Sequence, residues 1–119
     1  MDGQNSMIIL MIGGRAQGKR AYAEQHFPGC RIVDAYQERV REALSAGRDP
    51  MREAEELLRA LRKERLGCVV ICEEVGCGVI PMERSERVYQ EAVGRVCCSF
   101  AEAADRVIRV TAGLGMQLK

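Results

Sequence analysis

The sequence contains no tryptophan, and aromatic residues make up only 4% of its 119 residues. Hydrophobic residues nevertheless make up 47%, so the core must be largely aliphatic, which suits an α/β interior. A domain of this length buries roughly two-thirds of the surface that its unfolded chain would expose. Because no shift in composition divides the chain, we predict that residues 1–119 form one domain.

An excess of charge of one sign is also missing. The 18 basic and 17 acidic residues are spread along the whole sequence and leave a formal net charge of +1. Binding of DNA or RNA would require basic residues clustered on one face. We therefore predict no nucleic-acid partner and interpret most of the charges as a solvated surface.

The chain has no long hydrophobic run. The first apolar run, at residues 7–12, is only six residues long, and no basic residue precedes it. A membrane-spanning helix needs about 20 apolar residues, and a signal peptide needs a basic segment before its apolar one. We predict neither a membrane span nor a signal peptide, and we expect a cytoplasmic protein.

The sequence has no C-x-x-C pair, and a single histidine accompanies its six cysteines. These cysteines are Cys30, Cys68, Cys72, Cys77, Cys97 and Cys98. Cys68 and Cys72 lie in an apolar run, where cysteine behaves as a small hydrophobic residue. We predict reduced, structural cysteines; a metal site or a redox switch is the alternative. The histidine, His26, is interpreted as a residue near a helix C-terminus that takes no part in chemistry.

Four near-continuous apolar runs, at residues 7–12, 30–34, 67–72 and 107–112, are predicted to be strands of a parallel sheet covered on both faces. Helices are predicted at about residues 18–26, 35–46 and 84–104. Another helix is predicted to start at Asp49 and Pro50, with one apolar stripe made of Ala54, Leu57, Leu58 and Leu61. This order predicts an α/β fold, a P-loop-type three-layer sandwich with a small, mostly parallel four-stranded sheet.

A glycine-rich stretch follows the first predicted strand. Residues 13–19 read Gly-Gly-Arg-Ala-Gln-Gly-Lys and fit the phosphate-binding pattern G-x-x-x-x-G-K-[ST], except that Arg20 replaces the final hydroxyl residue. Backbone N–H groups of such a loop surround phosphate oxygens, and Lys19 is expected to hold the outer phosphates. The side-chain oxygen that normally helps to hold Mg²⁺ is missing. The predicted nucleotide-binding residues here are Gly13, Gly14, Arg15, Ala16, Gln17, Gly18, Lys19 and Arg20.

Two acidic residues follow predicted strands, at the edge where open parallel sheets bind ligands. Asp34 ends the second strand and is a candidate for contacts with Mg²⁺ or the nucleotide; an N-cap of the next helix is the alternative. Glu74 follows the third strand, as does the acidic residue that orients metal or water in P-loop enzymes. The predicted catalytic residues are therefore Lys19, Asp34 and Glu74, with Asp34 as the candidate Mg²⁺ ligand.

Further candidates for phosphate or substrate contacts follow Glu74. Gly76 and Gly78 would let the backbone approach a ligand closely, although an ordinary glycine-rich turn is the alternative. Arg84 and Arg87 fall on neighbouring turns of the last predicted helix, and Arg95 falls further along it. For each arginine, a solvated or carboxylate-paired side chain is the alternative reading.

Taken together, these segments resemble the bifunctional adenosylcobinamide kinase/adenosylcobinamide-phosphate guanylyltransferase family of cobalamin biosynthesis. The resemblance is carried by the loop, Glu-Val-Gly-Cys-Gly-Val-Ile-Pro at residues 74–81, Arg84-x-x-Arg87, Gly94-Arg95-Val96, Ala104-Asp105 and the final Ala-Gly-Leu-Gly-Met-Gln-Leu-Lys. It covers about residues 7–26 and 30–119. It implies that the loop and Asp34 contact GTP or ATP and that adenosylcobinamide is the acceptor.

The resemblance implies a reaction in two steps. The family phosphorylates a hydroxyl of adenosylcobinamide and then adds GMP from GTP through a guanylylated histidine, which lies between the loop helix and the acidic strand. In this sequence Phe27-Pro28-Gly29 leads directly into that strand, and the position of His26 does not match that of the family's histidine. Cys97 and Cys98 also stand where the family tends to have asparagine and glutamine. We therefore expect a shortened member in which the kinase half is favoured over guanylyl transfer.

A nucleotide-binding or regulatory protein of the same fold, without turnover, is the alternative function. If Arg20 lines the phosphate site, its fixed charge would replace Mg²⁺ and make binding independent of metal. Loss of a family segment would also expose a strand edge, so a homo-oligomer is a further expectation.

Overall fold

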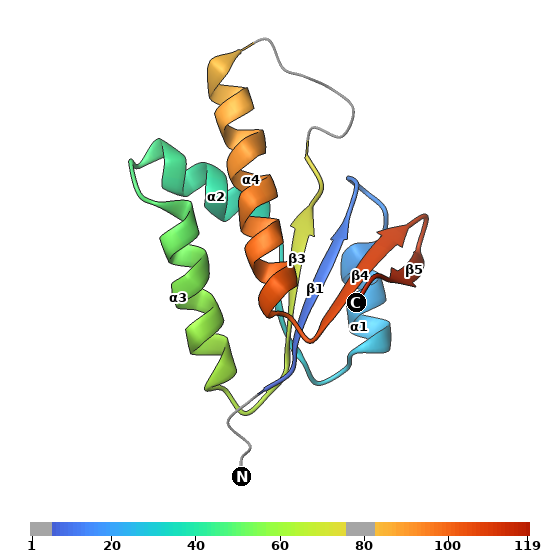
Figure 1. Ribbon diagram of the computed structural model, residues 1–119. Coiled ribbons are helices and arrows are strands. Elements are labelled where there is room, and N and C mark those ends of the chain that lie inside the picture. Colours follow the sequence, from blue (N-terminus) through green and yellow to red (C-terminus); the bar gives the residue numbers. More distant parts are fainter. Residues whose placement is uncertain (1–5, 76–82) are drawn as a thin grey trace.

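The computed structural model describes residues 6–75 and 83–119. In this part of the chain the elements are β1 (Ile8–Gly13), α1 (Lys19–His26), β2 (Arg31–Val33), α2 (Tyr36–Ser45), α3 (Pro50–Arg62), β3 (Cys68–Glu73), α4 (Arg84–Ala103), β4 (Arg106–Thr111) and β5 (Leu114–Gln117). They form one sheet in the order β2-β3-β1-β4-β5 (Figure 1). The first four strands run parallel, and β5 pairs antiparallel with β4. The predicted α/β class and mostly parallel sheet are confirmed.

The prediction of four strands is wrong, because the described sheet has five. The missed strand, β5, has only four residues, all exposed, and glycine and glutamine alternate with its two apolar residues. It forms because Ala112 and Gly113, with φ of 51° and 76°, turn the chain sharply back along β4. β5 is an edge strand with Leu114 and Met116 exposed. Self-association through a free edge stays a prediction.

Two apolar cores lie on opposite faces of the sheet (Figure 1). One face packs against α2, α3 and α4, with Val40, Leu58 and Phe100 as contributors from these helices. The other face packs against α1, chiefly through Ala23. Strand residues alternate between the two faces, since Ile8 belongs to the first core and its neighbour to the second. This covering of both faces explains why the strands appear in the sequence as unbroken apolar runs.

The start of α3 is fixed as its sequence predicts. The Asp49 carboxylate accepts hydrogen bonds from the backbone N–H groups of Met51 (3.0 Å) and Arg52 (3.4 Å), and Pro50 occupies the first turn. The predicted stripe faces the core, with Leu58 and Leu61 buried. The N-terminal cap and the buried face of α3 are therefore both as the sequence predicts.

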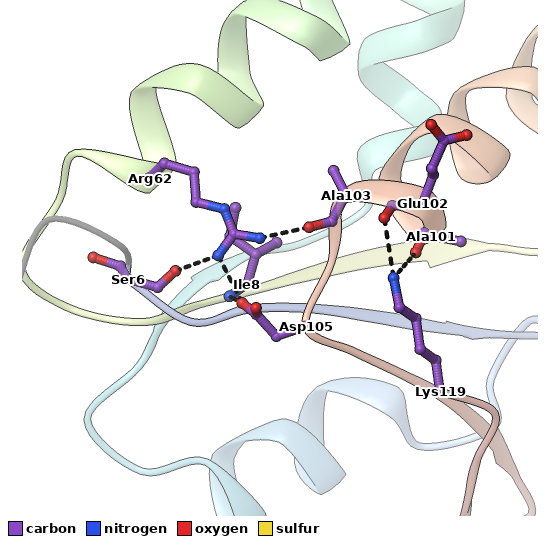
Figure 2. Close-up of polar contacts among 8 residues, drawn as sticks. All are labelled: Ser6, Ile8, Arg62, Ala101, Glu102, Ala103, Asp105 and Lys119. Carbon is purple, nitrogen blue, oxygen red and sulfur yellow. Dashed lines mark hydrogen bonds and ion pairs between the residues drawn. The ribbon is translucent and has the colours of Figure 1, made fainter.

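Arg62, the last residue of α3, joins three segments at the amino end of the sheet (Figure 2). Its guanidinium donates to the Ser6 carbonyl (2.8 Å), to Oδ2 of Asp105 (2.7 Å) and to the Ala103 carbonyl. Asp105 also accepts from the Ile8 backbone N–H at 2.8 Å. Partial burial opposes ionisation of Asp105, but these hydrogen bonds outweigh it and hold the pKa of that carboxyl below its usual range.

A second cation binds the end of α4. Lys119 Nζ donates to the carbonyls of Ala101 and Glu102, each at 3.0 Å (Figure 2). Positive charge at a helix C-terminus is favourable, because it satisfies carbonyls that have no partner within the helix. Together with Arg62, Lys119 fixes the end of α4 beside the sheet.

Replacing Arg62 with methionine is expected to lower the free energy of unfolding by about 2 kcal/mol, since it removes charged hydrogen bonds but keeps an apolar stem. Urea denaturation followed by circular dichroism measures the change. Arg52→Met is the matched control on the same helix, because the Arg52 side chain is 76% exposed and lies 3.9 Å from its carboxylate partner. Equal losses in the two variants would contradict a structural role of Arg62.

Candidate functional site

The glycine-rich loop runs from the end of β1 to the start of α1. Gly18 precedes the helix with φ of 86°, a left-handed conformation that favours glycine. Lys19, the first residue of the helix, donates from Nζ to the Gly14 carbonyl at 2.6 Å. The ammonium group is therefore held over the loop itself, where backbone N–H groups and a helix N-terminus favour anions. Phosphate binding by this loop stays a prediction.

Two hydrogen bonds join the turn between β4 and β5 to the glycine-rich loop. The Gln17 side-chain carbonyl accepts from the Ala112 backbone N–H at 2.6 Å, and the Gly113 N–H donates to the Gln17 main-chain carbonyl at 2.9 Å. Sequence reasoning placed Gln17 in the loop without identifying this contact. No local signal could have found it, because it depends on the hairpin that the sequence pattern missed.

Arg20 and Asp34, both predicted nucleotide-binding residues, form an ion pair. Arg20 donates from a terminal nitrogen to Oδ2 of Asp34 at 3.2 Å and from Nε to Glu24 at 3.3 Å. The hydrogen bond with Asp34, followed by that with Glu24, raises the pKa of the Arg20 guanidinium. Asp34 accepts from the Ala35 N–H at 2.7 Å but does not cap α2, whose N-cap is Ala35. The capping alternative for Asp34 is therefore wrong.

Glu74 is held by Arg109 of β4. Two hydrogen bonds, Nε to Oε2 at 3.0 Å and a terminal nitrogen to Oε1 at 2.7 Å, make the pair bidentate. The Glu74 backbone N–H also donates to the Gly13 carbonyl at 2.8 Å. The predicted catalytic carboxylate thus lies beside the beginning of the loop, with both of its oxygens engaged by a cation.

Glu73, which sequence reasoning did not single out, faces a different partner. Gln37 of α2 donates from Nε2 to Oε2 of Glu73 at 3.3 Å, and its side-chain carbonyl accepts from the Glu73 N–H at 3.0 Å. The Gln37 residue is only 9% exposed, so this exchange fixes the end of β3 against α2. The available signal for Glu73 was its position directly after the apolar run predicted as a strand at residues 67–72; the sequence carries no signal for Gln37.

Beside the loop lies a polar cavity of about 750 Å³, whose lining includes Arg15, Gln37, Glu73, Glu74 and Tyr89. Arg15 belongs to the loop, so the cavity and the loop adjoin. One wall is stiffened by Arg41, whose guanidinium lies 3.8 Å from the centre of the Tyr89 ring and pairs with Glu86 at 2.9 Å. We refer to this space as the polar cavity.

The remaining predicted contacts are scattered. Arg84 lines a second hollow, which shares Arg41, Glu86 and Tyr89 with the polar cavity, and Arg87 is exposed on α4. Arg95 pairs with Glu91 at 3.0 Å and lines a groove between α3 and α4. No residue of the glycine-rich loop lines the hollow at Arg84 or the groove at Arg95. Gly76 and Gly78 lie outside the described residues.

The side chains present do not suit Mg²⁺ bound in the usual P-loop manner. A cation, Arg20, stands at the hydroxyl position and pairs with the candidate ligand Asp34. Within residues 6–75 and 83–119, no group of three or more histidine, cysteine, aspartate or glutamate side chains is arranged to hold a metal ion. Among the same residues, none of the helices has the length and apolar character needed to cross a bilayer.

Comparison with known proteins identifies relatives. The model of a family described as cobinamide kinase / cobinamide phosphate guanyltransferase, CobU, matches residues 25–118. The bifunctional adenosylcobalamin biosynthesis protein CobU of Salmonella typhimurium is 35% identical over 63 residues, which make up 53% of this chain and 35% of that protein. The protein of the same name from Escherichia coli is 33% identical over 67 residues, which make up 56% and 37%.

The alignments thus span little more than a third of the length of these two relatives. The phosphate-binding loop, at residues 13–20, precedes the range matched by the family model and is supported by its own pattern and geometry. The family model nevertheless covers well over half of the chain, from the end of α1 almost to the last residue. The chain therefore belongs to the cobinamide kinase / cobinamide phosphate guanyltransferase family.

Proposed function

We propose that this protein binds GTP or ATP at residues 13–20 and transfers the terminal phosphoryl group to a hydroxyl of adenosylcobinamide, as a kinase-like member of its family in cobalamin biosynthesis. The observation that carries this proposal is that the loop, with Lys19 held over it, adjoins a polar cavity large enough for part of an acceptor. Arg15 lines the cavity and belongs to the loop, so donor and acceptor would meet there.

In this proposal the charges of the loop stabilise the phosphates. Lys19 holds the group in transfer, and Arg20 supplies a fixed positive charge in place of a metal-bound hydroxyl. Asp34 keeps Arg20 in position through their 3.2 Å contact. The Arg20 side chain is 55% exposed, so it can turn toward a bound nucleotide without first losing a buried partner.

The two carboxylates at the carboxyl end of β3, Glu73 and Glu74, have different proposed roles. Because Arg109 engages both oxygens of Glu74, that residue positions the end of β3 beside Gly13. Among the described residues, Gln37 donates to Oε2 of Glu73, and Glu73 lines the polar cavity. We therefore assign to Glu73 the orientation of the acceptor hydroxyl and acceptance of its proton.

Guanylyl transfer through a covalent histidine is not part of this proposal. His26, the one histidine of the chain, ends α1, which begins at the loop and runs to the other end of the sheet (Figure 1). Its ring stacks on Tyr22 with 4.0 Å between the ring centroids. This placement favours a structural role for His26.

A nucleotide-binding protein without turnover is the second candidate, favoured by the cation at the hydroxyl position. Arg20→Ser distinguishes the two accounts. On removal of Mg²⁺, we expect the affinity of the unaltered protein for ATP or GTP to change less than about 3-fold. The affinity of Arg20→Ser should fall about 10-fold or more on removal of Mg²⁺, because this variant regains a hydroxyl ligand for the metal and loses the fixed charge. Isothermal titration calorimetry with and without Mg²⁺ measures both.

Phosphate transfer to adenosylcobinamide is then assayed in parallel. Transfer by the unaltered protein supports the kinase; binding without transfer, with activity gained only in Arg20→Ser, supports the second candidate. Glu24→Gln is a matched control, because it removes the other carboxylate partner of Arg20 and leaves the positive charge of Arg20 in place. Absence of nucleotide binding in every condition would contradict both functions, and a stable GMP adduct on the protein would contradict the omission of guanylyl transfer.

A further inference from the structure

A surface groove of about 860 Å³ lies between α3 and α4, two helices that cover the same face of the sheet (Figure 1). Met51 and Leu58 of α3 and Ala103 of α4 give this groove an apolar lining. Because no residue of the glycine-rich loop lines it, the groove is separate from the proposed nucleotide site. We refer to this space as the α3–α4 groove.

The α4 wall of the groove is one face of that helix. The wall residues follow one another at spacings of three and four positions, as neighbours on one helix face do: Arg95, Cys98, Ser99 and Glu102. Gly94 belongs to the same wall, and a Cβ atom placed there would find no atom of the described residues within 4 Å. Glycine weakens the interior of a helix, and at this position it makes room for no other part of the described chain. The wall therefore has an open position where a second backbone can approach closely.

Two opposite charges on this wall are not paired with each other. Arg95 pairs with Glu91, one turn earlier, at 3.0 Å, and the two side chains are 69% and 67% exposed. Because such an exposed pair contributes little, the Arg95 guanidinium is available to a second carboxylate. Lys119 binds the main-chain carbonyl of Glu102, but the Glu102 carboxylate has no cation within the described part of the chain. The wall thus presents a weakly held cation and an unpaired carboxylate.

We propose that the α3–α4 groove is the interface of a symmetric dimer, in which α4 of each copy packs antiparallel into the groove of the other. In such a dimer one surface meets its own copy across a two-fold axis, and positions equally far from the axis lie opposite each other. With the axis between Cys98 and Ser99, Arg95 of each copy faces Glu102 of the other. The wall is therefore complementary in charge to itself, which identifies a second copy of the chain as the occupant.

The test exchanges these charges and measures association of the full-length chain by sedimentation equilibrium from about 1 μM to about 100 μM. We expect the unaltered protein to form a dimer within this range. Arg95→Glu and Glu102→Arg each place like charges opposite each other, so each should raise the dissociation constant about 10-fold or more. The double variant, Arg95→Glu with Glu102→Arg, restores both ion pairs and should bring the dissociation constant back to within about 3-fold of that of the unaltered protein.

Two further variants serve as controls within the groove. Glu55 lines it from α3, and the proposed pairing gives this carboxylate no cation, so Glu55→Gln should change the dissociation constant by less than about 3-fold. Gly94→Leu fills the open position on α4 and should abolish the dimer. Circular dichroism should show unaltered helix content in this variant, because the added Cβ meets no described atom within 4 Å. Equal weakening by Glu55→Gln and Glu102→Arg would contradict the proposed pairing.

Cross-linking tests the position of the axis. Cys98 is exposed and would lie next to the axis, so a short bismaleimide should join two copies through Cys98, and Cys98→Ser should give no cross-linked dimer. Peptide mapping identifies the linked residues. A monomer at every concentration, a dimer that the charge variants leave unchanged, no recovery in the double variant, or a cross-link through other cysteines would overturn the proposal. Pairing through the edge strand β5 would give a dimer that the charge variants leave unchanged.

Discussion

Replacing Lys19 with methionine is expected to weaken binding of ATP or GTP on the order of 100-fold, the effect of removing one charged hydrogen-bond donor from a phosphate site. The reason lies in the placement of the ammonium group, which is held at 2.6 Å from the Gly14 carbonyl within the loop. Methionine keeps most of the side-chain length and removes the charge. Calorimetric titration of both nucleotides measures the loss of affinity.

Lys63→Met is the matched control, because Lys63 is an exposed lysine at the C-cap of α3, far along the chain from the loop. It should leave the dissociation constant unchanged. Thermal unfolding of both variants separates loss of binding from loss of the folded state. An affinity of Lys19→Met within about 3-fold of the unaltered protein would place the phosphates elsewhere and contradict the proposed function.

Replacing Gly13 with alanine is expected to destabilise the fold by about 3 kcal/mol, near the upper end of the usual cost of overpacking. A Cβ atom at this position would lie 2.4 Å from the Val110 carbonyl oxygen, a backbone atom of the adjacent strand β4. Neither backbone can yield without separating two parallel strands of the sheet. Urea denaturation measures the change in free energy of unfolding.

Gly14→Ala is the matched control, since its Cβ would find its nearest atom, Cγ of Gln17, at 3.7 Å. That is an ordinary contact, so the expected change in stability is within about 1 kcal/mol. The pair distinguishes crowding from any general intolerance of the loop to side chains. Similar stabilities of Gly13→Ala and Gly14→Ala would show that β1 and β4 are less closely packed than described.

The elements that sequence patterns predicted well are those whose signals are local. Strands buried on both faces appear as unbroken apolar runs, and Asp49 with Pro50 marks the start of α3. β5 could not be predicted in this way, because its four exposed residues bury nothing and its existence depends on pairing with β4. A strand held only by a neighbour leaves little trace in its own sequence.

The same distinction between local and long-range signals applies to the candidate site. The loop carries its own pattern, in which Gly18 takes a left-handed conformation and Lys19 donates back to the Gly14 carbonyl; phosphate binding by these residues stays a prediction. The ion pairs Arg20–Asp34 and Arg109–Glu74 join residues 14 and 35 positions apart, and no local pattern specifies such partners. Arg84 and Arg95, grouped by their shared helix, line different hollows, because residues on one helix need not share a face.

The contact between Gln17 and the β4–β5 turn has a thermodynamic consequence. Two hydrogen bonds, at 2.6 Å and 2.9 Å, make the shape of the loop depend on a closed hairpin. Linkage is reciprocal, so an anion that favours the ordered loop must also favour the closed hairpin, by the same free energy. If the loop binds phosphate as proposed, the short edge strand β5 contributes to that affinity by closing the hairpin.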